Sequence, residues 1–268
     1  MNRNLAHFEF HCSIISIMQQ SITDSIHKFE AIGLEALNSV ALMKRTDTKF
    51  ILHVSRLPEI LDAVKSDYRA LEIEDNRIMT YNTVYFDTDM NDYYHDHHNG
   101  KVRRVKVRKR VYKDSNLCFL EIKKKDGKGR TNKFRTEIAL EEFENELSPR
   151  SMSFINETID IKKSLSRTIN NSFKRITLAN DKAKERVTID FDLNYKTKEN
   201  KKAFEHLAII EVKQERLNRR SPIITALKKI GNNPYKISKY CIGMASLNRN
   251  VKYNKFKQKL LKIENLSA

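Results

Sequence analysis

Residues 102–112, with the sequence VRRVKVRKRVY, decide the fold that we expect for this chain. Alternate residues of a β-strand point to opposite faces of a sheet, so every second residue of this stretch shares a face. One face carries valines and Lys109, and the other carries four cations: Arg104, Lys106, Arg108 and Arg110. Like charges this close repel one another. The stretch therefore predicts a strand whose charged face meets an anion, with a plainly solvated face as the simpler alternative.

Five further stretches repeat this pattern of a charged face opposite a largely apolar one. They are KRTDTKF (44–50), FLEIKKK (119–125), NKFRTEI (132–138), ERVTIDF (185–191) and IIEVKQE (209–215). Their charged stripes include Arg45, Asp47, Lys49, Glu121, Lys123, Lys125, Lys133, Arg135, Glu137, Arg186, Asp190, Glu211, Lys213 and Glu215. We expect the sheet to close into a barrel with these stripes in its lumen, because closure removes exposed strand edges.

Hydrophobic spacing and turn signals predict an α+β fold with eight mostly antiparallel strands and flanking helices. The strands are expected near residues 44–54, 79–88, 103–112, 117–125, 131–140, 173–180, 184–195 and 205–215. Helices are expected over residues 23–37, 55–70, 141–170 with a break at Pro149, 222–230 and 239–262. Asn99-Gly100 indicates a turn, and Asp126-Gly127 indicates a hairpin.

The composition points to a polyanionic partner. The 268 residues include 51 Lys and Arg against 34 Asp and Glu, which gives a net charge of +17. No run approaches the roughly 18 apolar residues of a membrane-spanning helix. The three cysteines, Cys12, Cys118 and Cys241, lie too far apart for a zinc site or a disulfide framework. We therefore expect a cytoplasmic protein, for which Met18 is an alternative start to Met1.

Cations and carboxylates on the same strand faces indicate a particular chemistry. A lumen lined by Arg and Lys attracts phosphate groups, which guanidinium groups bind in bidentate fashion. Carboxylates repel phosphate unless a divalent cation bridges the two. Many cations with few carboxylates therefore favour a site for a metal and a triphosphate over a plain polyanion-binding surface.

Taken in order, nine motifs are similar to the polyphosphate polymerase domain of the vacuolar transporter chaperone (VTC) family, which belongs to the triphosphate tunnel metalloenzymes. They are KRTDTKF, TYNTVYFDT, KVRKRVY, FLEIKKK, TNKFR, FKRITL, ERVTIDF, IIEVKQ and ISKYCIGM. The resemblance implies an eight-stranded antiparallel β tunnel with a basic lumen over residues 42–254. Residues 1–41 are then an N-terminal extension and helix, and residues 255–268 a basic C-terminal helix or tail.

The resemblance implies a metal-dependent transfer of the ATP γ-phosphate to a growing inorganic polyphosphate chain, with Mn²⁺ or Mg²⁺ as cofactor. The residues implied to be catalytic are Arg108, Arg110, Lys123, Arg175, Arg186 and Lys239. Together with the charged stripes, it implies a phosphate- and nucleotide-binding set of Arg45, Lys49, Arg104, Lys106, Lys133, Arg135, Lys213 and Ser238. Glu211 resembles the carboxylate that holds the metal.

Two other functions stay open. Hydrolytic relatives carry an ExExK strand with paired carboxylates, whereas this chain reads RTDTK with Arg45 in place of the first acid. A triphosphatase acting on triphosphate or nucleotides is the alternative enzyme, and a non-catalytic polyphosphate- or polyanion-binding module is the alternative from another class. We expect no nucleic acid partner, since the chain has no Trp and no aromatic-rich strand for stacking bases. The chain resembles the stand-alone bacterial form, so a separate membrane-protein partner and a place at the inner face of the membrane are further expectations.

Some charged residues allow more than one interpretation. Residues 92–98 hold two Asp and three His, which indicate solvated loop residues, a metal cluster, or a phosphate contact by His97 at the tunnel mouth. Glu121 is expected to neutralise Lys123, with a second metal ligand as the alternative. Residues 252–262 predict a solvated basic helix, with anionic lipid or an emerging polyphosphate chain as alternative contacts.

Overall fold

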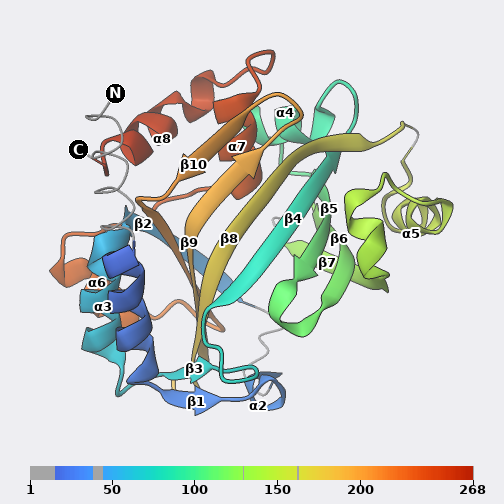
Figure 1. The fold of residues 1–268 in the computed structure, drawn as a ribbon. Coiled ribbons are helices and arrows are strands. Elements are labelled where there is room, and N and C mark those ends of the chain that lie inside the picture. Colours follow the sequence, from blue (N-terminus) through green and yellow to red (C-terminus); the bar gives the residue numbers. More distant parts are fainter. Residues whose placement is uncertain (1–15, 39–44, 129, 162, 268) are drawn as a thin grey trace, which may run out of the picture. The chain divides into compact units, whose positions relative to one another are not determined.

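The computed structural model of the chain describes residues 16–38, 45–128, 130–161 and 163–267 (Figure 1). Predictions that fall on residues 1–15, including Cys12, and on the first residue of the strand expected from residue 44 lie outside the described residues.

The described chain is α+β. Its strands are β1 (Glu30–Ile32), β2 (Thr46–His53), β3 (Arg69–Leu71), β4 (Met79–Asp87), β5 (Arg104–Tyr112), β6 (Leu117–Lys125), β7 (Thr131–Ile138), β8 (Ser166–Asn180), β9 (Glu185–Lys196), β10 (Lys201–Phe204) and β11 (Leu207–Gln214). Residues 16–27 are helical, and the further helices are α2 (Leu34–Asn38), α3 (Leu57–Val64), α4 (Asp92–His98), α5 (Pro149–Ile159), α6 (Pro222–Lys229), α7 (Lys239–Leu247) and α8 (Asn254–Glu264). Short 3-10 turns occur at η1 (Val54–Arg56), η2 (Lys113–Ser115) and η3 (Leu140–Glu144).

One mostly antiparallel sheet runs through the fold in the order β2-β11-β9-β8-β4-β5-β6-β7. These eight strands are the eight that the sequence predicts, so the α+β class with flanking helices is confirmed. Three short strands, β1, β3 and β10, were not predicted and attach beside this path. Within the described residues the hydrogen-bonded path is open, with β2 and β7 at its ends, rather than closed into a barrel.

Three of the predicted helices are wrong in part, because strand pairing and helix ends override local periodicity. The helix expected over residues 23–37 is split, since residues 30–32 form β1, which pairs in parallel with β3. The helix expected over residues 141–170 ends at Asp160, whose backbone adopts a left-handed conformation with φ 44°, and β8 begins at Ser166. The stretch 239–262 is likewise two helices, because α7 ends at a cap on Asn248.

Contacts group the chain into two compact units. Unit 1 comprises Met1–Ile78, Arg175–Asp190 and His206–Lys236, and unit 2 comprises Met79–Lys174, Phe191–Glu205 and Ile237–Ala268. β8 and β9 contribute residues to both units, whereas every other strand belongs to one. The boundaries predicted for an extension, a tunnel domain and a tail stay a prediction.

In unit 2, one face of the sheet forms the apolar core, which η3 and α5 cover (Figure 1). Its buried members are Val84, Phe86, Val107, Val111, Cys118, Leu120, Ile122, Ile138, Phe143, Ile155 and Leu165. Lys109 is fully buried on this face, where its Nζ donates to three backbone carbonyls, those of Glu142, Asn145 and Glu146, at 2.7, 3.1 and 3.0 Å. The alternation predicted for residues 102–112 is therefore confirmed, and Lys109 serves the core.

In unit 1, the core lies between the sheet and the helices α3 and α6 (Figure 1). The five residues predicted to share one face of the segment 55–70 are all buried: Leu57, Ile60, Leu61, Val64 and Tyr68. The strand β11 pairs with β2 on one side and with β9 on the other. This pairing brings three of the predicted charged stripes together. Among the described helices, none is both long and apolar enough to cross a membrane.

Candidate phosphate-binding site

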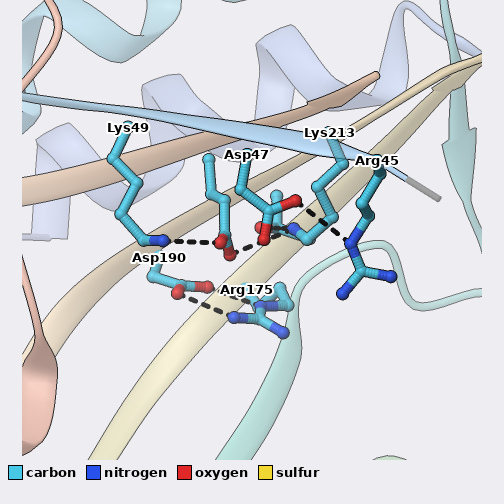
Figure 2. Close-up of polar contacts among 8 residues, drawn as sticks. Arg45, Asp47, Lys49, Arg175, Asp190 and Lys213 are labelled. Carbon is cyan, nitrogen blue, oxygen red and sulfur yellow. Dashed lines mark hydrogen bonds and ion pairs between the residues drawn. The ribbon is translucent and has the colours of Figure 1, made fainter. Parts of the chain in front are cut away.

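Cluster 1 is a set of charged side chains on β2, β8, β9 and β11 of unit 1, with one residue just before β2 (Figure 2). Its members are Arg45, Asp47, Lys49, Arg175, Arg186, Asp190, Glu211 and Lys213. Strand register places Asp47, Lys213 and Arg186 side by side across three strands. The predicted stripes of β2, β9 and β11 thus meet on one face.

Glu211, the predicted metal ligand, lies between two lysines. Its Oε1 accepts a hydrogen bond from Lys49 Nζ at 2.7 Å, and its Oε2 lies 3.1 Å from Lys213 Nζ. The Glu211 side chain keeps 21% of its surface exposed, so a ligand can reach it. One carboxylate flanked by two ammonium groups suits a site that binds phosphate and a cation together.

The other two carboxylates of cluster 1 hold arginines (Figure 2). Arg175 donates from Nε and Nη2 to the two oxygens of Asp190, at 2.5 and 2.8 Å. This bidentate pair fixes the guanidinium plane. Arg45 Nε donates to Asp47 Oδ1 at 3.0 Å.

Arg186 is a cation of cluster 1 whose positive charge is not balanced by direct contact with any carboxylate in the described part of the chain. Burial lowers the pKa of its guanidinium, and Arg45 and Arg175 lower it further. Among the residues that the structure describes, no hydrogen bond or ion pair involves its side chain. An anion bound beside Arg186 would relieve this repulsion, as its predicted role requires.

Lys213 is expected to make phosphate binding sensitive to alkaline pH. Burial lowers the pKa of its ammonium group and outweighs the opposing effect of Glu211, so that this pKa is about 8. Below this pH Lys213 is charged and attracts phosphate; above it the proton is lost, so the Kd for tripolyphosphate should rise by up to about tenfold per pH unit. The ionisations of tripolyphosphate itself are the same for wild type and for a variant of Lys213, so a comparison of the two separates them from the effect of Lys213. Calorimetric titrations at several pH values measure it, and Lys213→Arg, which stays charged, should flatten the profile. A profile that is equally steep in Lys213→Arg would contradict the assignment.

Cluster 2 lies on the charged face of β5, β6 and β7 in unit 2. Its members are Lys106, Arg108, Arg110, Glu121, Lys123 and Lys133. Strand register aligns three lysines in one row across the three strands: Lys106, Lys123 and Lys133. Like charges directly opposite one another are unfavourable in a sheet. This row therefore favours a bound anion.

Glu121 is the buried carboxylate of cluster 2, and its side chain is completely inaccessible to solvent. Arg108 donates from Nε to Glu121 Oε2 at 2.7 Å, and Lys133 forms a second ion pair with Oε1. Burial alone would raise the pKa of Glu121, but Arg108, Arg110 and Lys133 outweigh it and hold this pKa far below its usual range. The sequence suggested Lys123 as the partner of Glu121; the structure pairs it with Arg108 and Lys133. A completely buried carboxylate between two cations positions those cations and is a poor metal ligand.

Two aromatic rings contact the side chain of Arg110. Its guanidinium carbon lies 5.6 Å from the ring centre of Tyr81 and 5.5 Å from that of Phe173, and its Nε donates to Thr83 Oγ1 at 3.0 Å. Lys239 Nζ lies 4.7 Å from the same Phe173 ring. Rings orient a cation without neutralising its charge. Arg110 and Lys239 therefore keep the charge that their predicted catalytic role needs.

The beginning of α7 joins cluster 2 through Ser238. Ser238 Oγ accepts a hydrogen bond from Lys106 Nζ at 3.0 Å and caps the helix by accepting from the Cys241 N–H. The predicted Ser238-Lys239 pair thus lies beside β5. Two predicted binding residues lie further out: Arg135 covers the Phe119 ring at 4.8 Å on the exposed strand β7, and Arg104 lies opposite Lys125.

Tyr85 is a site residue that the sequence reasoning missed. It is buried on β4 directly opposite Arg108, and its ring stacks on Tyr240 with 4.8 Å between ring centres. Burial would raise the pKa of this phenol, but four cations outweigh burial and lower it: Arg108, Arg110, Lys106 and Lys239. The signal was present in TYNTVYFD, where the period of two places Tyr81, Thr83 and Tyr85 on one face of the strand.

Residues 92–98 form helix α4 rather than a loop, because Asp87 accepts the N–H groups of Tyr93 and Tyr94 at its start. Two of its acids are engaged in ion pairs, Asp92 with Lys163 and Asp96 with Lys101. No group of three or more His, Cys, Asp or Glu in the described part of the chain is placed to hold a metal ion. The alternative of a metal cluster in this segment therefore has no geometric support.

The same finding limits how a metal could bind at Glu211. The described residues supply no cage of three protein ligands there. Mg²⁺ is commonly held by one or two carboxylates, with water and substrate phosphates completing its octahedron. Glu211, partly exposed and beside phosphate-binding lysines, fits a cation that arrives with a triphosphate.

The antiparallel sheet carries two clusters in which cations outnumber carboxylates, an arrangement suited to phosphate-rich anions. A family model described as the VTC domain matches residues 44–248. This match spans most of the chain, so the protein belongs to the VTC domain family, and the resemblance seen in the sequence motifs is confirmed. Membership of this family supports an enzyme that acts on phosphate compounds.

Comparison with curated proteins yields no match. Among solved structures, a Hippeastrum protein described as a candidate adenylyl cyclase with a dominant triphosphatase activity is 14% identical, with 76% of this chain and 96% of that chain covered and a TM-score of 0.49. A candidate adenylate cyclase from Bacillus halodurans is 11% identical, with 73% and 96% covered and a TM-score of 0.47. Likenesses this distant carry no argument about function.

Proposed function

We propose that the protein is a polyphosphate polymerase, which transfers the γ-phosphate of ATP to the end of a growing inorganic polyphosphate chain. Membership of the VTC domain family supports this proposal. The electrostatics of cluster 2 support it further, since four cations overcome the burial of Tyr85 and lower its pKa. A site with this excess of positive charge is suited to a chain of phosphates.

The observation that carries the proposal is the pairing around β2 in unit 1. Where hydrolytic relatives present two carboxylates for metal, this chain presents Arg45, Asp47 and Lys49, and Arg45 Nε binds Asp47 at 3.0 Å. Paired with Arg45, Asp47 is less able to hold the metal that activates water. Additional cations instead favour a second phosphate chain as the acceptor.

The reaction requires no protein nucleophile. A terminal phosphate oxygen of the acceptor chain attacks the γ-phosphorus of ATP and forms a new P–O bond. The bond between that phosphorus and the β,γ-bridging oxygen breaks, and its electron pair leaves with ADP. Arg110 and Lys239 would bind non-bridging oxygens and stabilise the charge of the transition state. A divalent cation at Glu211, Mn²⁺ or Mg²⁺, would supply charge neutralisation when bound.

The test is incubation of the purified protein with ATP and Mn²⁺ or Mg²⁺, with products resolved by ³¹P NMR. We expect a growing signal from internal phosphoanhydride groups, together with ADP and little orthophosphate. Glu211→Gln should lower this rate about 10²-fold, as loss of a transition-state contact does. The matched control is Glu215→Gln, an exposed acid just beyond the end of the same strand, which should leave the rate nearly unchanged.

Other outcomes identify the alternatives. Orthophosphate without polymer would establish a triphosphatase. Bound ATP or polyphosphate without turnover, and with an affinity that Glu211→Gln leaves intact, would indicate a binding module. A membrane-protein partner, a cytoplasmic location and the exclusion of nucleic acid stay predictions.

A further inference from the structure

A second group of basic side chains lies at the Arg104 end of β5 in unit 2. Arg104 is directly opposite Lys125 of β6. Among the described residues, neither side chain takes part in a hydrogen bond or an ion pair. Arg104 and Lys125 both lower the pKa of His97 of α4, and so does Lys259 of α8. We call these four residues the distal group.

His97 distinguishes the distal group from an ordinary solvated cluster of charges. Its Nδ1 is buried and has no hydrogen-bond partner in the described part of the chain, and its ring packs edge-on against Phe256 of α8, with 6.2 Å between ring centres. Burial, together with four cations from β5, β6 and α8, lowers the pKa of His97 to about 3; the cations are Lys106, Arg104, Lys259 and Lys125. The imidazole is therefore neutral at physiological pH. Buried polar atoms are nearly always satisfied, so this nitrogen indicates a partner from outside the chain.

The distal group continues the cations of cluster 2 along one strand. Arg104, Lys106, Arg108 and Arg110 share a face of β5, and at 3.2–3.4 Å per residue the row from Arg104 to Arg110 spans roughly 20 Å. Lys106 lies between cluster 2 and the distal group, because it lowers both the pKa of Tyr85 in cluster 2 and the pKa of His97 in the distal group. A triphosphate is much shorter than this row.

We propose that the distal group binds phosphate units of a polyphosphate chain beyond those that cluster 2 holds, and thereby makes the protein favour chains longer than a triphosphate. The proposal rests on the proposed function in one respect, that phosphate chains are the ligand of the basic sheet face. His97 Nδ1 gains a phosphate oxygen as its hydrogen-bond partner. Arg104 supplies a planar fork of donors, and Lys125 and Lys259 supply mobile ammonium groups.

The test is a calorimetric titration at fixed ionic strength, without nucleotide or metal, because salt alone shifts polyanion affinity. The ligands are inorganic tripolyphosphate and a size-fractionated polyphosphate of several tens of units. Lys259→Gln should weaken binding of the long chain about tenfold, as loss of one charge-assisted contact does, and leave tripolyphosphate affinity within about twofold. The matched control is Lys257→Gln, which removes the same charge from an exposed position of the same helix and should change neither affinity by more than about twofold.

His97→Gln gives a second variant of the distal group, checked for folding by thermal unfolding, and should repeat the length-selective loss. Equal losses in Lys257→Gln and Lys259→Gln, or a parallel loss of tripolyphosphate affinity, would overturn the distal site. Length-selective binding without any polymer in the NMR experiment would refute the proposed polymerase and leave the distal site standing. Polymer formation with equal polyphosphate affinity in Lys257→Gln and Lys259→Gln would support the polymerase and refute the distal site.

Discussion

Replacement of Arg110 by alanine is expected to lower kcat/KM for polyphosphate synthesis about 10²- to 10³-fold. Tyr81, Phe173 and Thr83 already orient its guanidinium, so the group is in place before substrate binds. Preorganised charge of this kind stabilises a transition state without a cost of reorganisation during the reaction. Initial rates of ADP release, with ATP and a polyphosphate primer, measure the effect.

The matched control for Arg110→Ala is Lys124→Ala. Lys124 is an exposed cation of the neighbouring strand β6, and its Nζ reaches the Thr158 carbonyl at 3.3 Å. It lies on the face opposite cluster 2, so its loss removes the same charge without touching the site. Equal rates in the two variants would show that only overall charge matters. Arg110→Lys should fall between wild type and Arg110→Ala, since it keeps the charge but loses the fork.

Replacement of Glu121 by glutamine is expected to destabilise the protein by about 3–5 kcal/mol, the usual cost of removing one partner of a buried ion pair. The substitution leaves Arg108 buried beside Lys133 and Arg110 without a compensating charge. Chemical denaturation measures the loss. Tripolyphosphate should restore more stability to Glu121→Gln than to wild type, because the ligand replaces the missing negative charge.

The control for Glu121→Gln is Glu137→Gln, which changes an exposed acid on β7 and should cost little. The sign of the pH dependence follows from the depressed pKa of Glu121. Its contribution is fully present above the ordinary glutamate pKa of 4.5 and is lost as pH falls below it. The stability difference between wild type and Glu121→Gln should therefore be constant near neutral pH and shrink in acid. A difference that grows in acid would contradict the ion pair.

The strands were predictable from sequence because their signal is repeated and local. Six of the eight alternate charged and apolar residues, and a period of two survives any tertiary arrangement. The strands β1 and β3 carry no such signal, since three residues are too few to show a period and their pairing is decided by the packing around them. The helix expected over residues 23–37 failed for the same reason.

The sequence predicts which side chains lie on the charged faces of the strands, but it does not predict which of them form ion pairs with one another. Alternation places Glu121 on the charged face, but its choice of Arg108 and Lys133 depends on burial and on side-chain reach across strands. Tyr85 was missed because a phenol among apolar residues reads as core. Its significance comes from β5, which lies beside it in the sheet and distant from it in the sequence. Nor does a sequence pattern show that His97 Nδ1 lacks a partner.

The alternation of β5 also guards the chain against misassembly. A slip of one residue against β4 and β6 would reverse every side chain, bring Lys109 out of the core and drive Arg104, Lys106, Arg108 and Arg110 into it. Ionised groups without partners are intolerable in such surroundings, so the slipped alignment is excluded as the sheet forms. Substrate recognition and strand alignment thus depend on the same four residues. Variants that neutralise several of them together lose a safeguard of folding along with their affinity for phosphate.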